Sequence, residues 1–387
     1  MARKKKILIA SDNFLPRWDG VTRFILEILT SFEKNFDVTL LAPDFGEINQ
    51  TFRKSLMKTK LIKIPVYNKK IGDFQLAKPK LSKIKEAVKS SDAVFVQTIG
   101  TIGYLTIKYA KKFKKPIFGY THSLEWKLVI RSINPIFIVK QIIEKLAISI
   151  ARNSYNKCDI IFVPYEYHIK ELEKYGITAR KKVVNLGVNT TAFNPKISKT
   201  KMKEELGLSN DFVIGYVGRI ANEKDIPTLY RAFKKVQRDK TNVKLLIVGS
   251  GLKSLENRLR KDSSVILVGS TDNPEKYYAA MNIYVLPSLL ETTSLTTLEA
   301  MATGLPVIVT PVGMLNDYIN RDVNGLFFPR RNSDVLASKI IYLMENKDFA
   351  NKLGKEARKT ALKFSWRKTC DRLVKLITKY TEEKSHL

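Results

Sequence analysis

The feature that most restricts the fold of this chain is an alternation of short β-rich runs with helical patterns. In the first half, five runs read as strands: residues 5–11, 37–43, 93–98, 116–122 and 159–164. Apolar residues recur at helical spacing in residues 20–34, and a further helix is expected near 102–113. Strands that alternate with helices predict a parallel, doubly wound α/β sheet, and the run at 159–164 is expected to close it.

The second half repeats the same alternation. It has strand-like runs at residues 212–219, 243–251, 265–270, 282–288 and 305–311, with helical patterns at 225–237 and 295–304. A length of 387 residues also favours two domains, because a single hydrophobic core rarely grows beyond about 250–300 residues. We therefore expect two similar α/β domains that face each other across a cleft, with ligands bound at the carboxyl ends of the strands.

The composition is strongly basic, with 68 Lys and Arg against 37 Asp and Glu and a formal net charge of +31. Such a charge attracts phosphate ligands, nucleic acid or acidic lipid headgroups, but the lysine-rich proteome of a heat-adapted organism would produce it as well. The two cysteines, Cys158 and Cys370, make no disulfide framework, which favours a reducing compartment. With no recognisable signal peptide and no run of 18 apolar residues, the sequence predicts a cytoplasmic protein without a membrane-spanning helix.

The most informative stretch, residues 287–313, carries two glutamates separated by seven residues. Glu291 is expected in a loop at the carboxyl end of a strand, and Glu299 in the opening turns of the next helix. The first amides of that helix, around Ser294 and Leu295, lack intrahelical partners and suit a phosphate, while the two carboxylates suit sugar hydroxyls. The alternative for Glu299 is an ordinary acidic residue favoured near a helix amino end.

Two cations and one glycine also follow strands. Arg219 and Lys224 lie between a strand and a helix, where a guanidinium fork and an ammonium group can clamp a diphosphate and stabilise a leaving group. Gly20, after the first strand, lets the backbone approach a phosphate or a sugar closely. Taken singly, each has an ordinary alternative, which is a pair of solvated cations in one case and a plain turn in the other.

Together these stretches resemble the retaining GT-B glycosyltransferases of family four, of the glycosyl transferases group 1 type. The resemblance extends over essentially the whole chain. It rests on DGV (19–21), GVNTTAFNP (187–195), VGRIANEKD (217–225), IVGSG (247–251), VLPS (285–288) and the glutamate block that ends in EAMATGLPVI (299–308). It implies two Rossmann-like domains, residues 1–190 for the acceptor and 191–365 for the nucleotide sugar, and a helix at 366–387 that packs back on the first domain.

The resemblance also implies roles for a set of catalytic residues. Arg219 and Lys224 would bind the donor diphosphate, Glu291 would contact the transferred sugar, and Gly20 would lie under the donor phosphates. His122 would line the sugar pocket, and its alternative is a buried histidine at a strand end. We expect His122, Glu291, Arg219 and Lys224 to be the residues that support catalysis.

Further residues would complete the donor site. The resemblance implies that Glu299 contacts the ribose and that the amides of Ser294 and Leu295 hold the distal phosphate. Leu267 and Gly269 would lie near the base. No cofactor is expected, because the nucleotide sugar is itself a substrate.

The chain departs from the family's pattern at three places. The first Gly of the usual pair is Asp19, the usual Asp of the GVD signature is Asn189, and residues 292–294 replace the common Gly-Phe-Gly. The third change lies beside the phosphates and the sugar, so the identity of the donor stays open. The run ETTSLT is also similar to an ETQGLT-like version in some bacterial diacylglycerol glucosyltransferases, which hints at a lipid acceptor.

The chain has no Asp-x-Asp pair and no His and Cys cluster with metal-ligand spacing. A metal-dependent transferase would need such ligands to hold Mg²⁺ or Mn²⁺ on the diphosphate. We expect Arg219, Lys224 and the helix end to supply the positive charge instead, so the sequence predicts no metal. Retention is implied by the resemblance, and no residue is an obvious carboxylate nucleophile. The hypothesis is therefore a reaction on one face of the sugar, in which the departing phosphate takes the acceptor's proton.

An amphipathic basic segment lies in the predicted acceptor domain. Residues 134–157 have apolar side chains at 138, 139, 142, 143, 146, 147 and 150, with Lys140 and Lys145 off that stripe, and Trp126 upstream reads as exposed. Together with the lysines of residues 52–90, this segment suits an anionic bilayer surface. The alternative is a helix that faces the core of the first domain.

The sequence therefore predicts a hexosyltransferase that uses a nucleotide-diphosphate sugar, with a UDP-sugar favoured. Its acceptor would be the hydroxyl of a lipid or lipid-linked glycan, and the protein would bind peripherally to the inner face of the cell membrane. The alternatives are a GDP-mannose donor, a soluble or polysaccharide acceptor, or a non-catalytic basic protein that binds nucleic acid. The last needs aromatic residues among the basic ones or a binding module, and the sequence has neither, so no nucleic-acid partner is expected.

Overall fold

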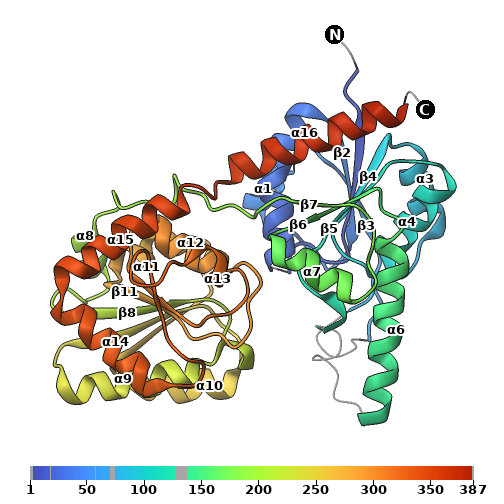
Figure 1. Cartoon of the computed structure of the whole chain (residues 1–387). Coiled ribbons are helices and arrows are strands. Elements are labelled where there is room, and N and C mark those ends of the chain that lie inside the picture. Colours follow the sequence, from blue (N-terminus) through green and yellow to red (C-terminus); the bar gives the residue numbers. More distant parts are fainter. Residues whose placement is uncertain (1–2, 18, 57, 70–74, 128–136, 386–387) are drawn as a thin grey trace. The chain divides into compact units, whose positions relative to one another are not determined.

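The computed structural model describes residues 3–17, 19–56, 58–69, 75–127 and 137–385 (Figure 1). The chain divides into two compact units: unit 1 comprises residues 1–185 and 366–387, and unit 2 comprises residues 186–365. Unit 2 thus begins before the boundary expected at residue 190. The reason is local, because the backbone N–H of Val188 donates to the carbonyl of Phe364 at 2.8 Å.

The sheet of unit 1 is parallel throughout and has the order β3-β2-β1-β4-β5-β6-β7. Its strands are β1 (Lys6–Ala10), β2 (Asp37–Pro43), β3 (Lys60–Ile64), β4 (Ala93–Val96), β5 (Ile117–Tyr120), β6 (Ile160–Val163) and β7 (Lys181–Val183). The central strands β4, β5 and β6 are buried along their whole length, which explains why they read as continuous apolar runs. The predicted α/β class is therefore confirmed.

Helices cover both faces of this sheet. They are α1 (Gly20–Asn35), α2 (Gln50–Ser55), α3 (Leu81–Lys89), α4 (Thr101–Lys112), α6 (Phe137–Tyr155), α7 (Glu166–Lys174) and α16 (Trp366–Ser385). The helices α3, α4, α6 and α7 share one core with the sheet, and α3 packs on α4, which packs on α6. The helix α16 packs on α1, where the Cys370 thiol lies 3.7 Å from the Glu27 carbonyl oxygen and Trp366 contacts Phe24.

Two edge strands of unit 1 were not expected from the sequence. The run at 159–164 was expected to close this sheet, but β7 pairs beyond it as the outer strand, and β3 forms the opposite edge. Both strands carry lysines, as in KLIKI and KKV, and most of their residues are only half-buried. A lysine-rich edge strand lacks the apolar pattern of a central one and is an established way to protect a sheet edge.

Unit 2 repeats the architecture with a parallel sheet in the order β10-β9-β8-β11-β12-β13. Its strands are β8 (Phe212–Val217), β9 (Val243–Val248), β10 (Val265–Gly269), β11 (Ile283–Leu286), β12 (Val307–Val309) and β13 (Leu326–Phe327). Its helices are α8 (Lys199–Glu205), α9 (Ile226–Asp239), α10 (Lys253–Leu259), α11 (Pro274–Ala280), α12 (Leu295–Ala302), α13 (Leu315–Tyr318), α14 (Ser333–Glu345) and α15 (Lys347–Ala361), with a 3₁₀ turn η1 (Asn222–Lys224).

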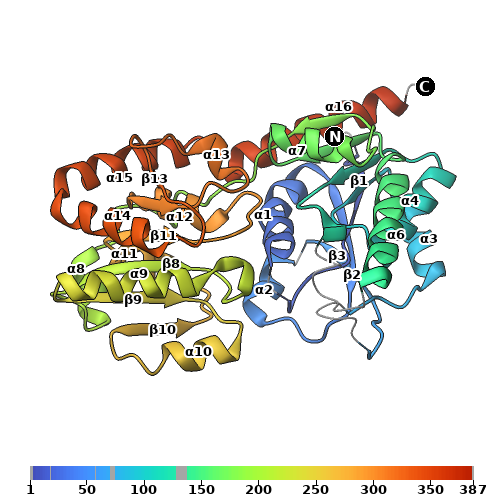
Figure 2. The same ribbon diagram turned by 60° about the horizontal axis from the view of Figure 1, so that its bottom comes forward.

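The helices of unit 2 lie in two layers. The pair α9 and α14 packs on one face of the sheet, whereas α12 packs against α15, and α11 against α8, on the other (Figures 1 and 2). The chain reaches each helix from the carboxyl end of the preceding strand, so the amino ends of α9 and α12 lie at the same edge of the sheet. This edge carries the candidate site.

Candidate functional site

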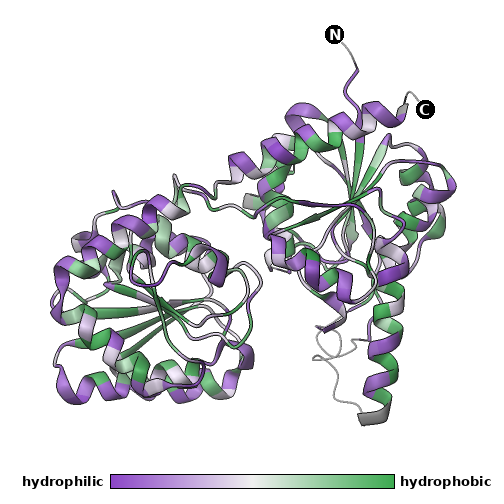
Figure 3. Cartoon of the chain, viewed as in Figure 1, coloured by the Kyte–Doolittle hydropathy of each residue, from purple (hydrophilic) through white to green (hydrophobic). Residues whose placement is uncertain are grey.

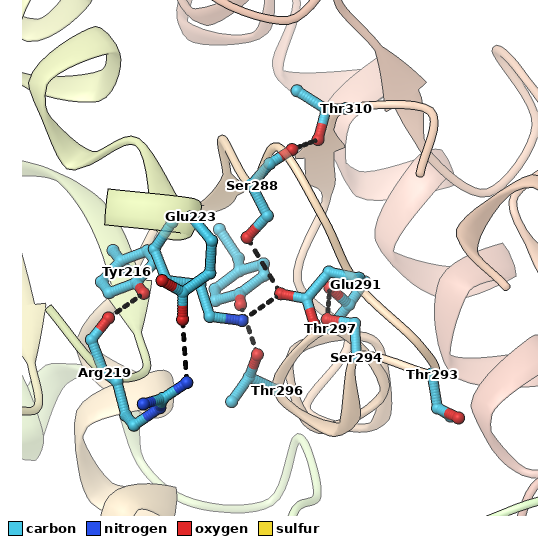
Figure 4. Close-up of polar contacts among 12 residues, drawn as sticks. Tyr216, Arg219, Glu223, Ser288, Glu291, Thr293, Ser294, Thr296, Thr297 and Thr310 are labelled. Carbon is cyan, nitrogen blue, oxygen red and sulfur yellow. Dashed lines mark hydrogen bonds and ion pairs between the residues drawn. The ribbon is translucent and has the colours of Figure 1, made fainter. Parts of the chain in front are cut away.

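The loop after β8 presents the first candidate cation. Arg219 follows the strand, and its side chain is 72% exposed. Its Nη2 donates to the Glu223 carboxylate at 2.8 Å, and its own carbonyl accepts from the Tyr216 hydroxyl at 2.8 Å (Figure 4). The guanidinium is thus held by one half-buried carboxylate and remains accessible to solvent.

A neighbouring loop fixes this backbone. The IVGSG motif follows β9, and a Cβ on Gly249 would lie 2.0 Å from the carbonyl oxygen of Gly218. The two loops are joined by hydrogen bonds from Gly218 to Val248 and from Ile220 to Ser250, each 2.9 Å long. Only glycine permits this approach, so the motif acts as a support for the Arg219 loop.

Lys224 and Glu291 form the central ion pair of the site. Their Nζ and Oε1 atoms are 2.5 Å apart, and the side chains are only 16% and 11% exposed. The Ser288 hydroxyl donates to the same carboxylate oxygen at 2.9 Å (Figure 4), and the Leu289 amide donates to the Glu223 carbonyl at 2.8 Å. Sequence reasoning placed both charged residues at strand ends but did not foresee that they bind each other.

The loop that carries Glu291 depends on a close contact. Gly313 has a φ of +55°, and a Cβ there would lie 2.2 Å from the carbonyl oxygen of Glu291. The next amide, that of Met314, donates to the Thr292 carbonyl at 2.8 Å. The segment after β12 therefore packs against the backbone of the Glu291 loop and supports it.

The amino end of α12 is open. Ser294 adopts a left-handed conformation with φ +55°, and its hydroxyl pairs with Thr297 at 2.8 Å rather than capping the helix. Within the part of the chain that the structure describes, no hydrogen bond is found for the backbone N–H of Leu295 or Thr296. Such amides, together with the partial positive charge of the helix end, suit an anion.

Glu299 lies deeper in the unit than Glu291. Its side chain is 1% exposed, and its Oε2 accepts from the Tyr278 hydroxyl at 2.8 Å. The Tyr278 hydroxyl also lies 3.0 Å from the Thr296 carbonyl, which links Glu299 to the amino-terminal turn of α12. The contact with a ribose that the resemblance implies stays a prediction.

Two buried tyrosines line the base of this region. The Tyr284 hydroxyl donates to Thr296 Oγ1 at 2.9 Å, and the Tyr216 hydroxyl holds the Arg219 loop. Burial raises the pKa of both phenols, and the nearby Glu291 charge raises it further. Both remain protonated hydrogen-bond donors at neutral pH, and neither was singled out from the sequence.

Leu267 and Gly269 lie on β10, the edge strand of the sheet. The register of β10 against β9 shifts between these two residues, and the Gly269 carbonyl accepts from the Gly249 amide at 2.7 Å. They are therefore connected to the Arg219 loop through the IVGSG motif. Their predicted place near the base stays a prediction.

The candidates in unit 1 belong to a separate group. His122 follows β5, and its Nε2 lies 3.1 Å from Gln97 Oε1. The Phe24 ring meets the imidazole edge-on, and the Tyr120 ring packs against it at a tilt. Burial, together with the nearby His168, lowers the pKa of His122 to about 3, so the ring is neutral at physiological pH. Gly20 is the exposed first residue of α1, and nothing lies within 4 Å of a Cβ built on it.

Two carboxylates of unit 1 were missed by sequence reasoning. Asp12 follows β1, and its carboxylate accepts from the amides of Gly100, Ile102 and Gly103 at 2.7–3.0 Å, which anchors the amino end of α4. Glu125 accepts from the Ile99 amide at 2.8 Å and the Tyr155 hydroxyl at 2.9 Å. Burial raises the pKa of Glu125 to about 7. Asp12 and Glu125 both follow strands of the sheet, and this position is the signal in the sequence that could have identified them.

Trp126 is a correction. The sequence suggested an exposed side chain, but Trp126 is 2% exposed and packs on Tyr175 within the core of unit 1. Residues 128–136, which follow Trp126 and include the start of the proposed membrane segment at 134–157, lie outside the described residues. Trp126 therefore contributes to folding rather than to a surface.

Metal-ligand clusters and membrane-spanning helices are both missing from the described part of the chain. Among the described residues, no group of three or more His, Cys, Asp and Glu side chains is arranged to hold a metal ion. Within the same residues, the structure has no helix with the length and apolarity needed to cross a bilayer. The predicted independence from metal stays a prediction.

Comparison with family models identifies both units. Residues 18–192 match the model of Glycosyltransferase Family 4, and residues 198–360 match that of Glycosyl transferases group 1. The two matches follow the two halves of the chain.

Comparison with individual known proteins also finds glycosyltransferases. An uncharacterized glycosyltransferase of Methanocaldococcus jannaschii is 30% identical over 55% of this chain, and the match spans 58% of that relative. The alpha-monoglucosyldiacylglycerol synthase of Streptococcus pneumoniae is 26% identical over 84% of this chain and 75% of its own length. The crystal structure of Anabaena HepE in complex with UDP-glucose matches with a TM-score of 0.79 and 17% identity, over 97% of this chain and 100% of that chain. The last comparison shows the fold alone.

Proposed function

The chain belongs to the GT-B glycosyltransferases of family four, and on this basis we propose that it transfers a hexose from a nucleotide-diphosphate sugar to a hydroxyl acceptor. The observation that carries the proposal is the Lys224–Glu291 ion pair. It lies at the carboxyl edge of the sheet of unit 2, where Arg219 and the open amino end of α12 also lie. Cations and unpaired amides at one edge suit a diphosphate, and a carboxylate among them suits a sugar hydroxyl.

Each residue has a distinct role in this proposal. Arg219 would exchange its exposed bond with Glu223 for a bidentate contact to the diphosphate, while Lys224 contributes a fixed charge. As the bond between the sugar and the phosphate breaks, negative charge builds up on the leaving oxygen, and these groups stabilise it. Glu291, already oriented by Lys224 and Ser288, would accept hydrogen bonds from the sugar.

The stereochemical course is proposed to be retention. The acceptor oxygen would form its bond to the anomeric carbon on the face from which the phosphate departs. The acceptor's proton then passes to the leaving phosphate oxygen, so that no protein nucleophile and no separate base are required. We propose that Arg219, Lys224 and the amides of Ser294 and Leu295 provide the positive charge for this step without a metal.

A UDP-sugar is the favoured donor and a lipid or lipid-linked glycan the favoured acceptor. Similarity to the alpha-monoglucosyldiacylglycerol synthase of Streptococcus pneumoniae supports the lipid acceptor. The fold shared with HepE, whose crystal holds UDP-glucose, supports the donor. The protein would then act as a peripheral enzyme at the inner face of the membrane. GDP-mannose and a polysaccharide acceptor are the alternatives.

Thermal unfolding in the presence of nucleotide sugars tests the donor. A ligand that binds only the folded state raises the melting temperature. We expect UDP-glucose to raise it more than GDP-mannose or ADP-glucose at equal concentration, with EDTA present in every sample. A larger shift with GDP-mannose would favour the mannosyl alternative, and no shift with any of the three would contradict the proposal.

A further inference from the structure

The helix α6 carries an apolar stripe that faces solvent. Val139, Ile142, Leu146 and Ile150 are 44%, 62%, 59% and 41% exposed. Steps of three and four residues place them on one side of the helix, along a length of about 16 Å at 1.5 Å per residue. Figure 3 shows apolar residues along the part of α6 that extends past the sheet.

This stripe is distinct from the side of α6 that packs on unit 1. Ala151 and Tyr155 are buried in the core, and Ala147 and Ile148 pack partly against it. The helix therefore has one apolar side that packs against the core of unit 1 and a second apolar side that is exposed to solvent. Of the two readings of residues 134–157, the core-facing one describes only the first of these sides.

Neighbouring helices place more apolar side chains near the same end. The helices α3, α4 and α6 lie side by side on one face of a parallel sheet and run antiparallel to its strands, so their amino ends meet at the carboxyl edge (Figure 2). Leu81 begins α3 and is 50% exposed, and Tyr104 in the first turn of α4 is 37% exposed. We call these two residues and the α6 stripe the docking face.

The charges around the docking face are mainly positive. Lys140 and Lys145 on α6, Lys83 on α3 and Lys108 on α4 are exposed, and Glu144 is half-buried between the two α6 lysines. Aliphatic side chains among lysines match a bilayer interface, where the apolar groups enter the acyl boundary and the ammonium groups meet acidic headgroups.

We propose that the docking face lies on the surface of an acidic lipid bilayer, with α6 parallel to the membrane plane. The stripe lies in the amino-terminal part of α6, and this helix begins at the carboxyl edge of the sheet, where open α/β proteins bind ligands, so that edge is near the lipid. The inference rests on the proposed function only in that a lipid-linked acceptor would be reached from this edge. Binding to the bilayer itself follows from the stripe and its charges.

Sedimentation with vesicles tests the proposal on the full chain. The wild-type protein is expected to bind phosphatidylglycerol vesicles at low salt and to bind phosphatidylcholine vesicles much less. The double variant Ile142→Ser/Leu146→Ser should bind the acidic vesicles at least about tenfold more weakly, because two exposed aliphatic anchors are lost. Both positions face solvent, so the melting temperature should not fall.

The matched control is Val323→Ser/Leu362→Ser, which removes two similarly exposed apolar side chains (52% and 45%) from unit 2. It should bind the vesicles as the wild type does. Equal binding by the Ile142/Leu146 variant would overturn the proposal, as would absence of wild-type binding to acidic vesicles. A wild-type dimer that the same variant converts to a monomer would also overturn it, because a second copy would then cover the stripe.

The outcome is separable from the proposed function. If vesicle binding does not depend on the stripe but UDP-glucose still raises the melting temperature, the docking face is wrong and the donor assignment stands. If the stripe controls binding but no nucleotide sugar binds, the docking face stands and the proposed function does not.

Discussion

At the scale of single residues, both cations of the candidate site already have carboxylate partners. The Arg219–Glu223 pair is exposed and contributes little to stability, so the guanidinium can leave it for a ligand at small cost. The Lys224–Glu291 pair is mostly buried, and removal of one member would leave an unpaired charge in a poorly solvated place. The exposed pair suits ligand exchange, whereas the buried pair suits a fixed position for both charges.

Glu125 gives a prediction for stability at different pH values. Its pKa is raised from 4.5 to about 7, chiefly by burial, so the folded state holds a proton that the unfolded state has lost between these values. Stability from this group is present below pH 4.5 and is lost as the pH rises through 7. Glu125→Gln should therefore stabilise the protein more at pH 8 than at pH 5, and the difference in unfolding free energy should be on the order of 1–3 kcal/mol. Thermal unfolding at the two pH values should show this as a larger rise in melting temperature at pH 8.

His122 has the opposite dependence, since its lowered pKa costs stability as the pH falls from 6.5 towards 3. The comparison of Glu125→Gln with the wild type at each pH therefore isolates the carboxyl group. An equal change in melting temperature at pH 5 and pH 8 would show that Glu125 has no raised pKa.

At the scale of elements, the apolar strands and their following helices were predictable, whereas several supporting contacts were not. The runs at 212–219, 243–251 and 282–288 contain β8, β9 and β11, because buried parallel strands are apolar throughout. Gly313 gave no signal, since its importance comes from a loop more than twenty residues earlier in the chain. Glu223 and Tyr278 were missed because hydrogen-bond partners are set by the tertiary fold.

The Gly313 contact predicts a loss of function through the backbone. Gly313→Ala would bring a Cβ within 2.2 Å of the Glu291 carbonyl, so the loop that carries this glutamate must move. We expect transfer to fall at least tenfold, because displacement of a catalytic group by about 1 Å can cost a hundredfold. A steady-state assay with the labelled donor measures the effect.

Gly207→Ala is the matched control for the Gly313 variant. Gly207 also has a positive φ, +67°, but nothing lies within 4 Å of the place that a Cβ would take there. Both variants carry similar backbone strain, and only one disturbs Glu291. Equal activity of the two variants would mean that the Gly313 contact does not position the glutamate.

At the scale of the whole molecule, one architecture occurs twice in a strongly basic chain. Each unit has a parallel sheet with helices on both faces, and the two family models match residues 18–192 and 198–360. A formal charge of +31 attracts every anion, including a nucleotide sugar. At physiological ionic strength, salt screens most of this attraction beyond about 8 Å. Activity must therefore be compared at constant ionic strength to separate the site from the general charge.

The central claim is that fixed cations in unit 2, rather than a metal, hold the donor diphosphate during transfer. Its most direct measurement is transfer of labelled glucose from UDP-glucose to a diacylglycerol acceptor in EDTA at constant ionic strength. We predict full wild-type activity, a loss of about 100-fold or more in Arg219→Ala, Lys224→Ala and Glu291→Ala, and no loss in Lys359→Ala, an exposed and similarly paired cation. Abolition of wild-type transfer by EDTA, or undiminished transfer in the Lys224 variant, would contradict the account.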